Sequence, residues 1–337
     1  MMTPSDIGGL VRDSLVELAW SQWNAIGVAG GGAKTRAIVD PEALFVASMG
    51  VARWDARLFD EVLDWVALNG PLLDTARMRR LSADASPAQR RLVLATIGSV
   101  VEPDERGGLR RVEDALLARE ETAEYAVEPL FHSDSVSPGD WVPADETFEA
   151  FGFRRPAPET RGMSVVPDGT SPPCLRFALR ALVGQGARAE TLVYLTTHDW
   201  AHGRLIAEHA AYNQSVVADY LASLYVSGLA LRRVRGRLTE YRLAEPLRSG
   251  LLPTPEYVAW RRAWPALNRI LEALSDQVSD DALWARLANA LDRERDALSV
   301  EGLGVDVPPI EGWVTRGPDE LAGIAVQLAE RCRELAR

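Results

Sequence analysis

The chain has 337 residues, of which 47% are hydrophobic and 25% charged, as in globular proteins with a substantial core. The net charge of −11 argues against a protein coated in nucleic acid, and no apolar run is long enough to predict a membrane span. The two cysteines, Cys174 and Cys332, fit a reduced cytoplasmic protein rather than a disulfide framework.

Residues 1–131 are predicted to form a helical domain. Early acids and the lack of a basic region before an apolar core argue against a signal peptide. Ser5 or Asp6 is expected to cap the first helix, and Asp40-Pro41-Glu42 has the capping acid and the proline of a helix start. The expected helices are Ser5–Ala25, Pro41–Val51, Asp55–Gly70, Leu72–Leu81, Ser86–Val101 and Leu109–Glu121.

The composition changes at His132. Residues 132–173 are rich in Pro, Gly, Ser and Asp and predict a linker between domains. Four aromatic residues in it are too many for a free linker, so part of it should pack on a neighbour: Trp141, Phe148, Phe151 and Phe153. A second domain is expected over 174–248 and a helical region over 249–337, with helices Leu175–Val183, Pro253–Ser275, Asp280–Ala297 and Pro318–Ala336.

The segment 189–244 has the most distinctive pattern. Three short apolar-periodic stretches follow one another, and the third has Val216, Val217, Leu221 and Leu224 as its predicted buried stripe. Asn213 stands where that helix should begin and Gly228 where it should end. Two alternating runs, Leu229–Val234 and Leu238–Leu243, then flank a glycine and predict a hairpin. The expected fold is therefore mainly α, with a central winged helix-turn-helix and its short β-hairpin wing.

Positive charge concentrates in the same region. Residues 174–248 contain ten arginines and six acids, a balance of +4, which leaves −15 for the rest of the chain. A modestly basic module in an acidic body is typical of a nucleic-acid contact. The alternative for the arginine-rich run 231–237 is a solvated strand edge that discourages sheet pairing.

Two motifs resemble a phosphate-binding loop and a metal site, but their residues do not support either interpretation. The run Gly27–Thr35 resembles a phosphate-binding loop, but Ala33 separates Gly32 from Lys34 and a helix precedes it, so we interpret it as a flexible surface loop. His198, His202 and His209 could suggest a metal site, but a helix break is expected between the first two and the acid of an H-E-x-x-H motif is missing. We expect no metal, no cofactor and no enzymatic activity, because no nucleophile motif is present either.

The residues 208–243 resemble the core of ArsR/MarR-type winged-helix transcriptional regulators. The resemblance rests on Asn213–Val217, on Leu221, Leu224 and Gly228-Leu229, and on Gly236-Arg237, Tyr241 and Leu243 in the wing, and it is confined to about residues 189–244, roughly a sixth of the chain. It implies a homodimer that places the helix 213–227 in the major groove of double-stranded DNA. Base contacts are then expected from Asn213, Gln214 and Ser215, and phosphate contacts from the wing arginines Arg232, Arg233, Arg235 and Arg237. Arg204 and Tyr220 are further expected DNA-binding residues.

One departure from the family pattern keeps a second function open. The helix 213–227 contains no Lys or Arg, and it carries Asp219, whose carboxylate would weaken binding to phosphates. The leading hypothesis is a cytoplasmic DNA-binding regulator with flanking helical domains for dimerisation, sensing or partner contact. The alternative is a protein-interaction adaptor or antitoxin-like component that uses the same fold without sequence-specific DNA binding.

Overall fold

The computed structural model describes residues 3–101, 107–120, 125–132, 143–245, 255–274, 280–309 and 317–337. Over these residues the chain is mainly helical, with one sheet of two strands and one of three, which confirms the predicted mainly-α class. Trp141, the predicted helix start at Pro253 and Arg248, one of the ten arginines of 174–248, lie outside the described residues.

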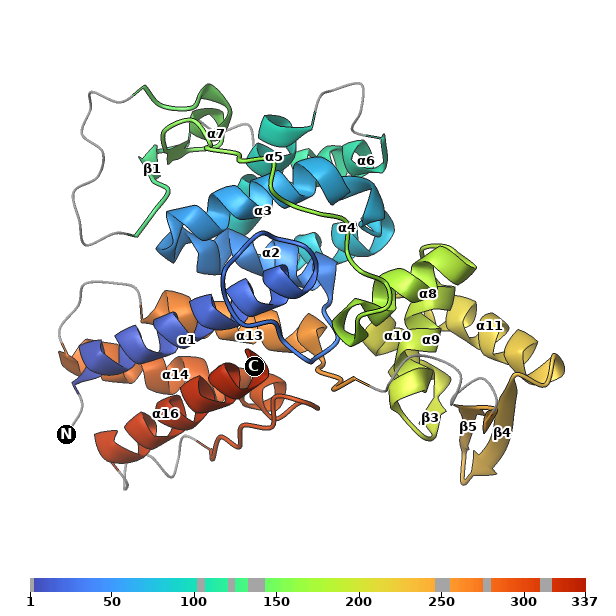
Figure 1. The fold of residues 1–337 in the computed structure, drawn as a ribbon. Helices are drawn as coiled ribbons and strands as arrows, with labels where there is room; N and C mark the ends of the chain where they lie inside the picture. Colours follow the sequence, from blue (N-terminus) through green and yellow to red (C-terminus); the bar gives the residue numbers. More distant parts are fainter. Residues whose placement is uncertain are drawn as a thin grey trace.

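Helices from both ends of the chain build the body of the molecule. The N-terminal helix α1 packs along the C-terminal helix α16, and α13 packs against both α2 and α14 (Figure 1). The long helices of the body are α1 (Pro4–Ala25), α2 (Pro41–Val51), α3 (Ala56–Asn69), α5 (Pro87–Val100), α13 (Trp260–Ala273), α14 (Asp280–Leu298) and α16 (Pro318–Leu335). The shorter elements are α4 (Thr75–Ala83), α6 (Gly107–Leu117), α7 (Glu146–Ala150) and the 3-10 turns Ala52–Trp54, Gly70–Leu72 and Pro172–Cys174.

One hydrophobic core joins the two ends of the chain. Ile7 and Trp23 of α1, Phe45 of α2, Trp264 of α13 and Leu328 of α16 are all at most 1% exposed and belong to it. The N-terminal helices and the C-terminal helices therefore share a core, so neither end buries its apolar face alone.

Capping residues determine where several helices begin. Asp40 accepts from the backbone N–H of Ala43 at the start of α2, and Ser86 forms a reciprocal capping box with Gln89 at the start of α5. Both starts were predicted from the sequence. The start of α1 was predicted at the wrong residue, because Thr3 is its cap and forms the capping box with Asp6.

Two other predicted helices begin later than expected. The helix expected at Leu72 is α4, which begins at Thr75 because Asp74 caps it by accepting from the N–H of Arg77. The helix expected at Pro253 is α13, which begins at Trp260. Its approach is extended, since Glu256 accepts a backbone hydrogen bond of 2.9 Å from the N–H of Ile38.

The region predicted as a linker is partly built into the body. Phe148 and Phe153 are fully buried in the main core, as the density of aromatic residues predicted, and Phe148 lies edge-on to Phe59 of α3. The short strands β1 (Glu128–Pro129) and β2 (Phe153–Arg154) pair in parallel beside them. This segment therefore packs against the helical body.

A second, smaller hydrophobic core lies at one end of the molecule (Figure 1). It is formed by four helices and a three-stranded antiparallel sheet in which β5 is central and β4 is an edge strand. The elements are α8 (Leu175–Val183), α9 (Ala187–Thr197), β3 (Ala201–His202), α10 (Gly203–Ala210), α11 (Gln214–Val226), β4 (Ala230–Arg235) and β5 (Leu238–Leu243). The predicted hairpin and the predicted helix Leu175–Val183 are confirmed.

Candidate nucleic-acid interface

The inner face of α11 anchors it to the small core. Val217, Leu221 and Leu224 are at most 4% exposed, and they follow the i, i+4, i+7 spacing of a single helix face. Val216 was wrongly predicted to belong to this stripe: it is 48% exposed, because it lies one residue outside the face that the other three define.

The outer face of α11 is uncovered. Gln214, Ser215 and Asp219 are exposed, and the helix packs on α9, α10 and β4. Figure 1 shows α11 and the β4–β5 hairpin at the edge of the molecule farthest from α1 and α16. Asn213 holds the predicted N-cap position in an extended conformation, but its side chain makes no capping hydrogen bond and is exposed. Gln214 and Ser215 thus stand at the open N-terminal end of an accessible helix.

Tyr220 is less available than its neighbours. It is half-buried, and the guanidinium carbon of Arg188 lies 5.8 Å from the centre of its ring. Arg188, on α9, is exposed and was not among the predicted contact residues. Arg188 is far from Tyr220 in sequence, so no local pattern indicated that the two side chains lie close together.

The arginines of the hairpin fall into two groups. Arg233 pairs with Glu240 at 2.6 Å, directly opposite it in the strand register, and lies over Trp200 at 4.2 Å from the ring centre. Arg232 lies 5.4 Å from the ring centre of Tyr225 of α11. Arg235 and Arg237 flank Gly236, whose φ of 63° suits the first position of a two-residue hairpin turn.

The hairpin tip carries two exposed arginines without a compensating acid among the described residues. Arg235 and Arg237 are exposed, and within the described part of the chain neither has an ion-pair partner. Arg204, near the start of α10, is exposed as well. By contrast, Arg176 and Arg180, which contributed to the predicted +4, are buried, so they add nothing to the accessible positive surface.

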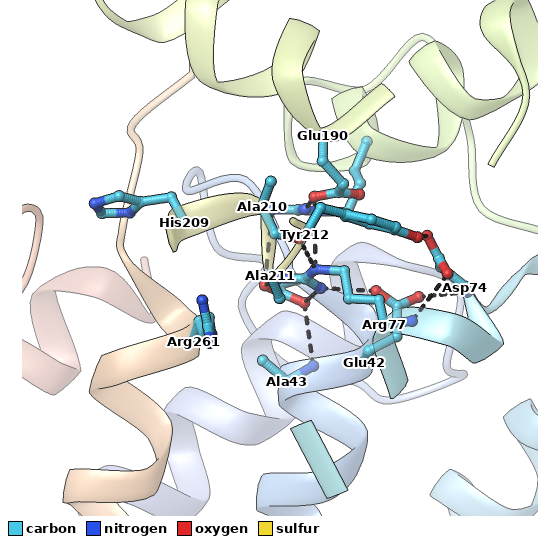
Figure 2. Close-up of polar contacts among 12 residues, drawn as sticks. Glu42, Ala43, Asp74, Arg77, Glu190, His209, Ala210, Ala211, Tyr212 and Arg261 are labelled. Carbon is cyan, nitrogen blue, oxygen red and sulfur yellow. Dashed lines mark hydrogen bonds and ion pairs between the residues drawn. The ribbon is translucent and has the colours of Figure 1, made fainter. Parts of the chain in front are cut away.

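Arg176 and Arg180 belong to a buried ionic network that joins this unit to the body. Figure 2 shows three other members of it, Glu42, Arg77 and Glu190. Arg180 donates to both carboxylate oxygens of Glu42, at 2.7 and 2.8 Å, and to Glu190 at 2.9 Å. Arg77 of α4 donates to Asp40 and, at 2.8 Å, to Glu42. Arg176 donates to Glu190. Three arginines and three carboxylates thus compensate one another away from water.

The network strongly perturbs its acids. Burial alone would raise the pKa of Asp40, but the adjacent Arg77 and Arg176 outweigh it and hold that pKa well below its usual value of 3.8. Burial acts likewise on Glu42, where Arg180 and Arg77 lower the pKa overall. Both acids are therefore ionised at neutral pH inside the protein.

Acidification should weaken this buried ionic network. Because the folded-state pKa values of Asp40 and Glu42 are depressed, their contribution to stability is complete above the usual values of 3.8 and 4.5 and is lost as the pH falls below them. We expect the free energy of unfolding, measured by urea denaturation from about pH 6 to pH 3, to stay nearly level until the pH approaches 4.5 and to fall below that value. The double variant Asp40→Asn, Glu42→Gln should show a smaller fall; an unchanged pH slope would contradict this assignment.

The segment 208–212, which is the end of α10 and the start of its connection to α11, is held by the body on several sides (Figure 2). Arg77 donates to the carbonyl of Ala210 at 3.2 Å, and Arg80 to that of Ala211 at 2.9 Å. The Tyr212 hydroxyl donates to Asp74 at 2.5 Å. Ala211 has a φ of 59°, a strained left-handed conformation for a residue with a Cβ atom. These contacts fix the orientation of α11 relative to the body.

Three further contacts reach this region from the C-terminal segment. Arg261 of α13 donates to the carbonyl of Glu208. His209 shares a hydrogen bond of 3.0 Å with the hydroxyl of Tyr257, and His198 shares one of 2.7 Å with Glu301. The third histidine, His202, caps α10 by accepting from the N–H of Leu205. The three histidines have separate structural partners, and the described residues contain no group of metal-binding side chains.

The glycine-rich run Gly27–Thr35 is a loop after α1. Gly31, Gly32 and Lys34 are exposed, while Thr35 is buried and its hydroxyl donates to the carbonyl of Leu335 at 2.6 Å. The position of the run after a helix agrees with the interpretation that it is not a phosphate-binding loop. The loop instead helps to attach the C-terminal helix.

No protein-family model, curated protein or solved structure matches the chain. No helix among the described residues is long and apolar enough to cross a bilayer.

Proposed function

We propose that the chain is a DNA-binding transcriptional regulator whose segment 174–245 is a winged helix-turn-helix. The observation that carries the proposal is the uncovered outer face of α11 beside a hairpin with unpaired arginines at its tip. The inner face of the same helix is buried, so the outer face is free for a partner without loss of core packing. In this arrangement α11 enters the major groove and the hairpin follows the phosphate backbone.

The residues divide by role under this proposal. Asn213, Gln214 and Ser215 contact base edges from the N-terminal end of α11, where an amide can bind adenine and a hydroxyl can bind several bases. Arg204, Arg232, Arg235, Arg237 and Arg188 neutralise phosphates. Arg233 is a weaker candidate because Glu240 already compensates its charge. The resemblance to ArsR/MarR-type regulators adds the expectation of a homodimer that binds two half-sites about one DNA turn apart.

Substitution at Gln214 should change sequence preference more than affinity for random DNA. We expect Gln214→Ala to lose about 1–3 kcal/mol of discrimination at one base position. The test is selection of bound fragments from sheared genomic DNA, followed by competition of the enriched site against its single-base variants. Ala222→Ser, at an exposed position farther along α11, is the matched control and should leave the preferred sequence unchanged.

A protein-binding adaptor is the second candidate function. Asp219 lies on the exposed face of α11, and large apolar side chains are exposed nearby: Val226 is 84% and Val234 67% exposed. Such side chains favour a protein partner over a polyanion. If no genomic fragment is enriched while cross-linking at position 226 captures one defined protein, the adaptor replaces the regulator.

A further inference from the structure

Strand β4 has a neighbouring strand on one side only within the described part of the chain. The sheet order is β3-β5-β4, so β5 pairs with one edge of β4 and the other edge faces outward (Figure 1). Five of the six residues of β4 are exposed. A free edge of this kind can pair with another strand unless something prevents it. The chemistry of the edge therefore determines what can bind there.

The backbone groups of every second residue of β4 point away from β5. The N–H of Ala244 donates to the carbonyl of Leu229 at 2.9 Å, so residues 229 and 244 form a hydrogen-bonded pair. Residues 231, 233 and 235 follow at steps of two and also bond to β5. The N–H and C=O groups of Ala230, Arg232 and Val234 are therefore directed outward. This row of alternating donors and acceptors complements the backbone of another strand, whereas a phosphate has no donors for the carbonyls.

The side chains along this edge are apolar and basic. Leu231 and Val234 are exposed, and so are Arg232 and Arg235, which have no ion-pair partner within the described residues. Arg233 differs, because Glu240 pairs with it at 2.6 Å. Cross-strand neighbours stabilise a sheet when apolar residues face apolar ones and opposite charges face each other. A complementary strand therefore has apolar residues opposite positions 231 and 234 and carboxylates opposite positions 232 and 235.

The same charges disfavour a second copy of β4 as the partner. The strand has only six residues, and three of them are Arg232, Arg233 and Arg235. Antiparallel pairing of two such edges would bring the arginines of one copy close to those of the other, and like charges across a sheet are destabilising. An acidic strand places opposite charges at these positions instead. The edge thus favours a foreign acidic segment over self-association.

We propose that the free edge of β4 binds an extended polypeptide segment as a fourth, antiparallel strand, and that β4 determines the order of side chains in this segment. Opposite residues 235 to 230, in turn, the segment has an acidic, an apolar, a neutral polar, an acidic, an apolar and a small residue. Binding of the segment does not depend on any DNA activity. One consequence rests on the proposed function: because Arg232 and Arg235 hold phosphates in the DNA complex, the segment and DNA compete.

The peptide acetyl-EVTEVS-amide has this order of residues and is the probe. We expect it to bind the full chain with a Kd of about 1 mM or tighter in ligand-observed NMR. Acetyl-KVTKVS-amide, whose lysines face the same two arginines, should bind at least about 10-fold more weakly. Equal binding of the two peptides, or no binding of the acidic peptide at about 10 mM, would overturn the proposal. The arginines would then serve only to prevent pairing at this edge.

N-methylation of the peptide separates backbone pairing from attraction between charges. In the antiparallel register the second and fourth peptide residues lie opposite Val234 and Arg232, so their N–H groups face β4. N-methylation of these two residues should weaken binding at least about 10-fold. N-methylation of the third and fifth residues, whose N–H groups face away, is the matched control and should preserve binding. Equal effects of the two modifications would contradict the proposed strand geometry.

Two variants of the protein locate the site. Val234→Pro removes one outward N–H and keeps the hydrogen bonds to β5, since proline is tolerated on the free side of an edge strand. It should weaken binding of the acidic peptide at least about 10-fold. Val234→Ala keeps the N–H and should lose no more than about 3-fold. Unchanged binding to Val234→Pro would overturn the site. Melting curves check that both variants fold, and the two methylated peptides decide on the unmodified chain if Val234→Pro does not.

A labelled DNA duplex tests the consequence for DNA binding. Saturating acidic peptide should weaken binding of a selected duplex at least about 3-fold, while the lysine peptide leaves it unchanged. Peptide binding without competition would contradict the shared use of Arg232 and Arg235. If the peptide binds and no DNA is bound in its absence, the proposed function fails and the strand-binding edge stands. If DNA is bound and the peptide is not, the edge fails and the regulator stands.

Discussion

Replacing Arg77 by Met is expected to lower the free energy of unfolding by about 3–5 kcal/mol. The substitution removes the cation that compensates Asp40 and Glu42, and it leaves two carboxylates buried with fewer donors. It also removes the hydrogen bond to the carbonyl of Ala210. Urea denaturation followed by circular dichroism measures the loss, which is a large share of the roughly 5–15 kcal/mol typical of a folded domain.

Arg79→Met is the matched control for this prediction. Arg79 belongs to the same helix but is exposed, so its replacement should change the free energy of unfolding by less than about 0.5 kcal/mol. If Arg77→Met lowers the free energy of unfolding no more than Arg79→Met does, the buried ionic network does not hold the small core of α8–α11 and β3–β5 to the helical body.

Charge reversal at the hairpin tip should have the largest effect on DNA binding. With Arg235→Glu and Arg237→Glu together, two cations that neutralise phosphates become two repelling anions. We expect a loss of about 1000-fold in affinity for a selected DNA site at roughly 0.1 M salt. Fluorescence anisotropy with a labelled duplex measures it. Because both residues are exposed in a surface turn, the melting temperature should stay the same.

Arg110→Glu and Arg111→Glu make the same change of net charge on α6, where both arginines are exposed. This control should lose far less affinity, since α6 lies on the body and not beside α11 (Figure 1). Equal losses in the two double variants would mean that net charge alone, and not the hairpin, governs any binding.

Local signals in the sequence were sufficient for much of the fold. A capping acid or serine followed by proline marks the starts of α2 and α5, and alternation around Gly236 marks the hairpin. The start of α13 was predicted wrongly because a contact distant in sequence decided it. The chain before α13 is extended because Glu256 pairs with Ile38, more than 200 residues away in sequence, and no local pattern reports such a pairing.

The candidate site was harder to predict than the fold around it. An arginine in a basic stretch has the same local appearance whether it is exposed or buried. Arg180 is buried because Glu42, on another helix, forms an ion pair with it. The charge of Arg233 is compensated because Glu240 lies opposite it in the strand register. The overall charge balance therefore overstated the accessible basic surface, whereas Arg235 and Arg237 remain exposed as expected.

The salt dependence of DNA binding tests the central proposal most directly. For the full chain with a selected duplex, the logarithm of the association constant should fall linearly with the logarithm of salt concentration. The variant Arg235→Ala, Arg237→Ala should reduce that slope by about 2, one for each lost phosphate contact. Absence of binding to any genomic fragment at low salt, or an identical slope for the two proteins, would contradict a regulator that holds DNA with this hairpin.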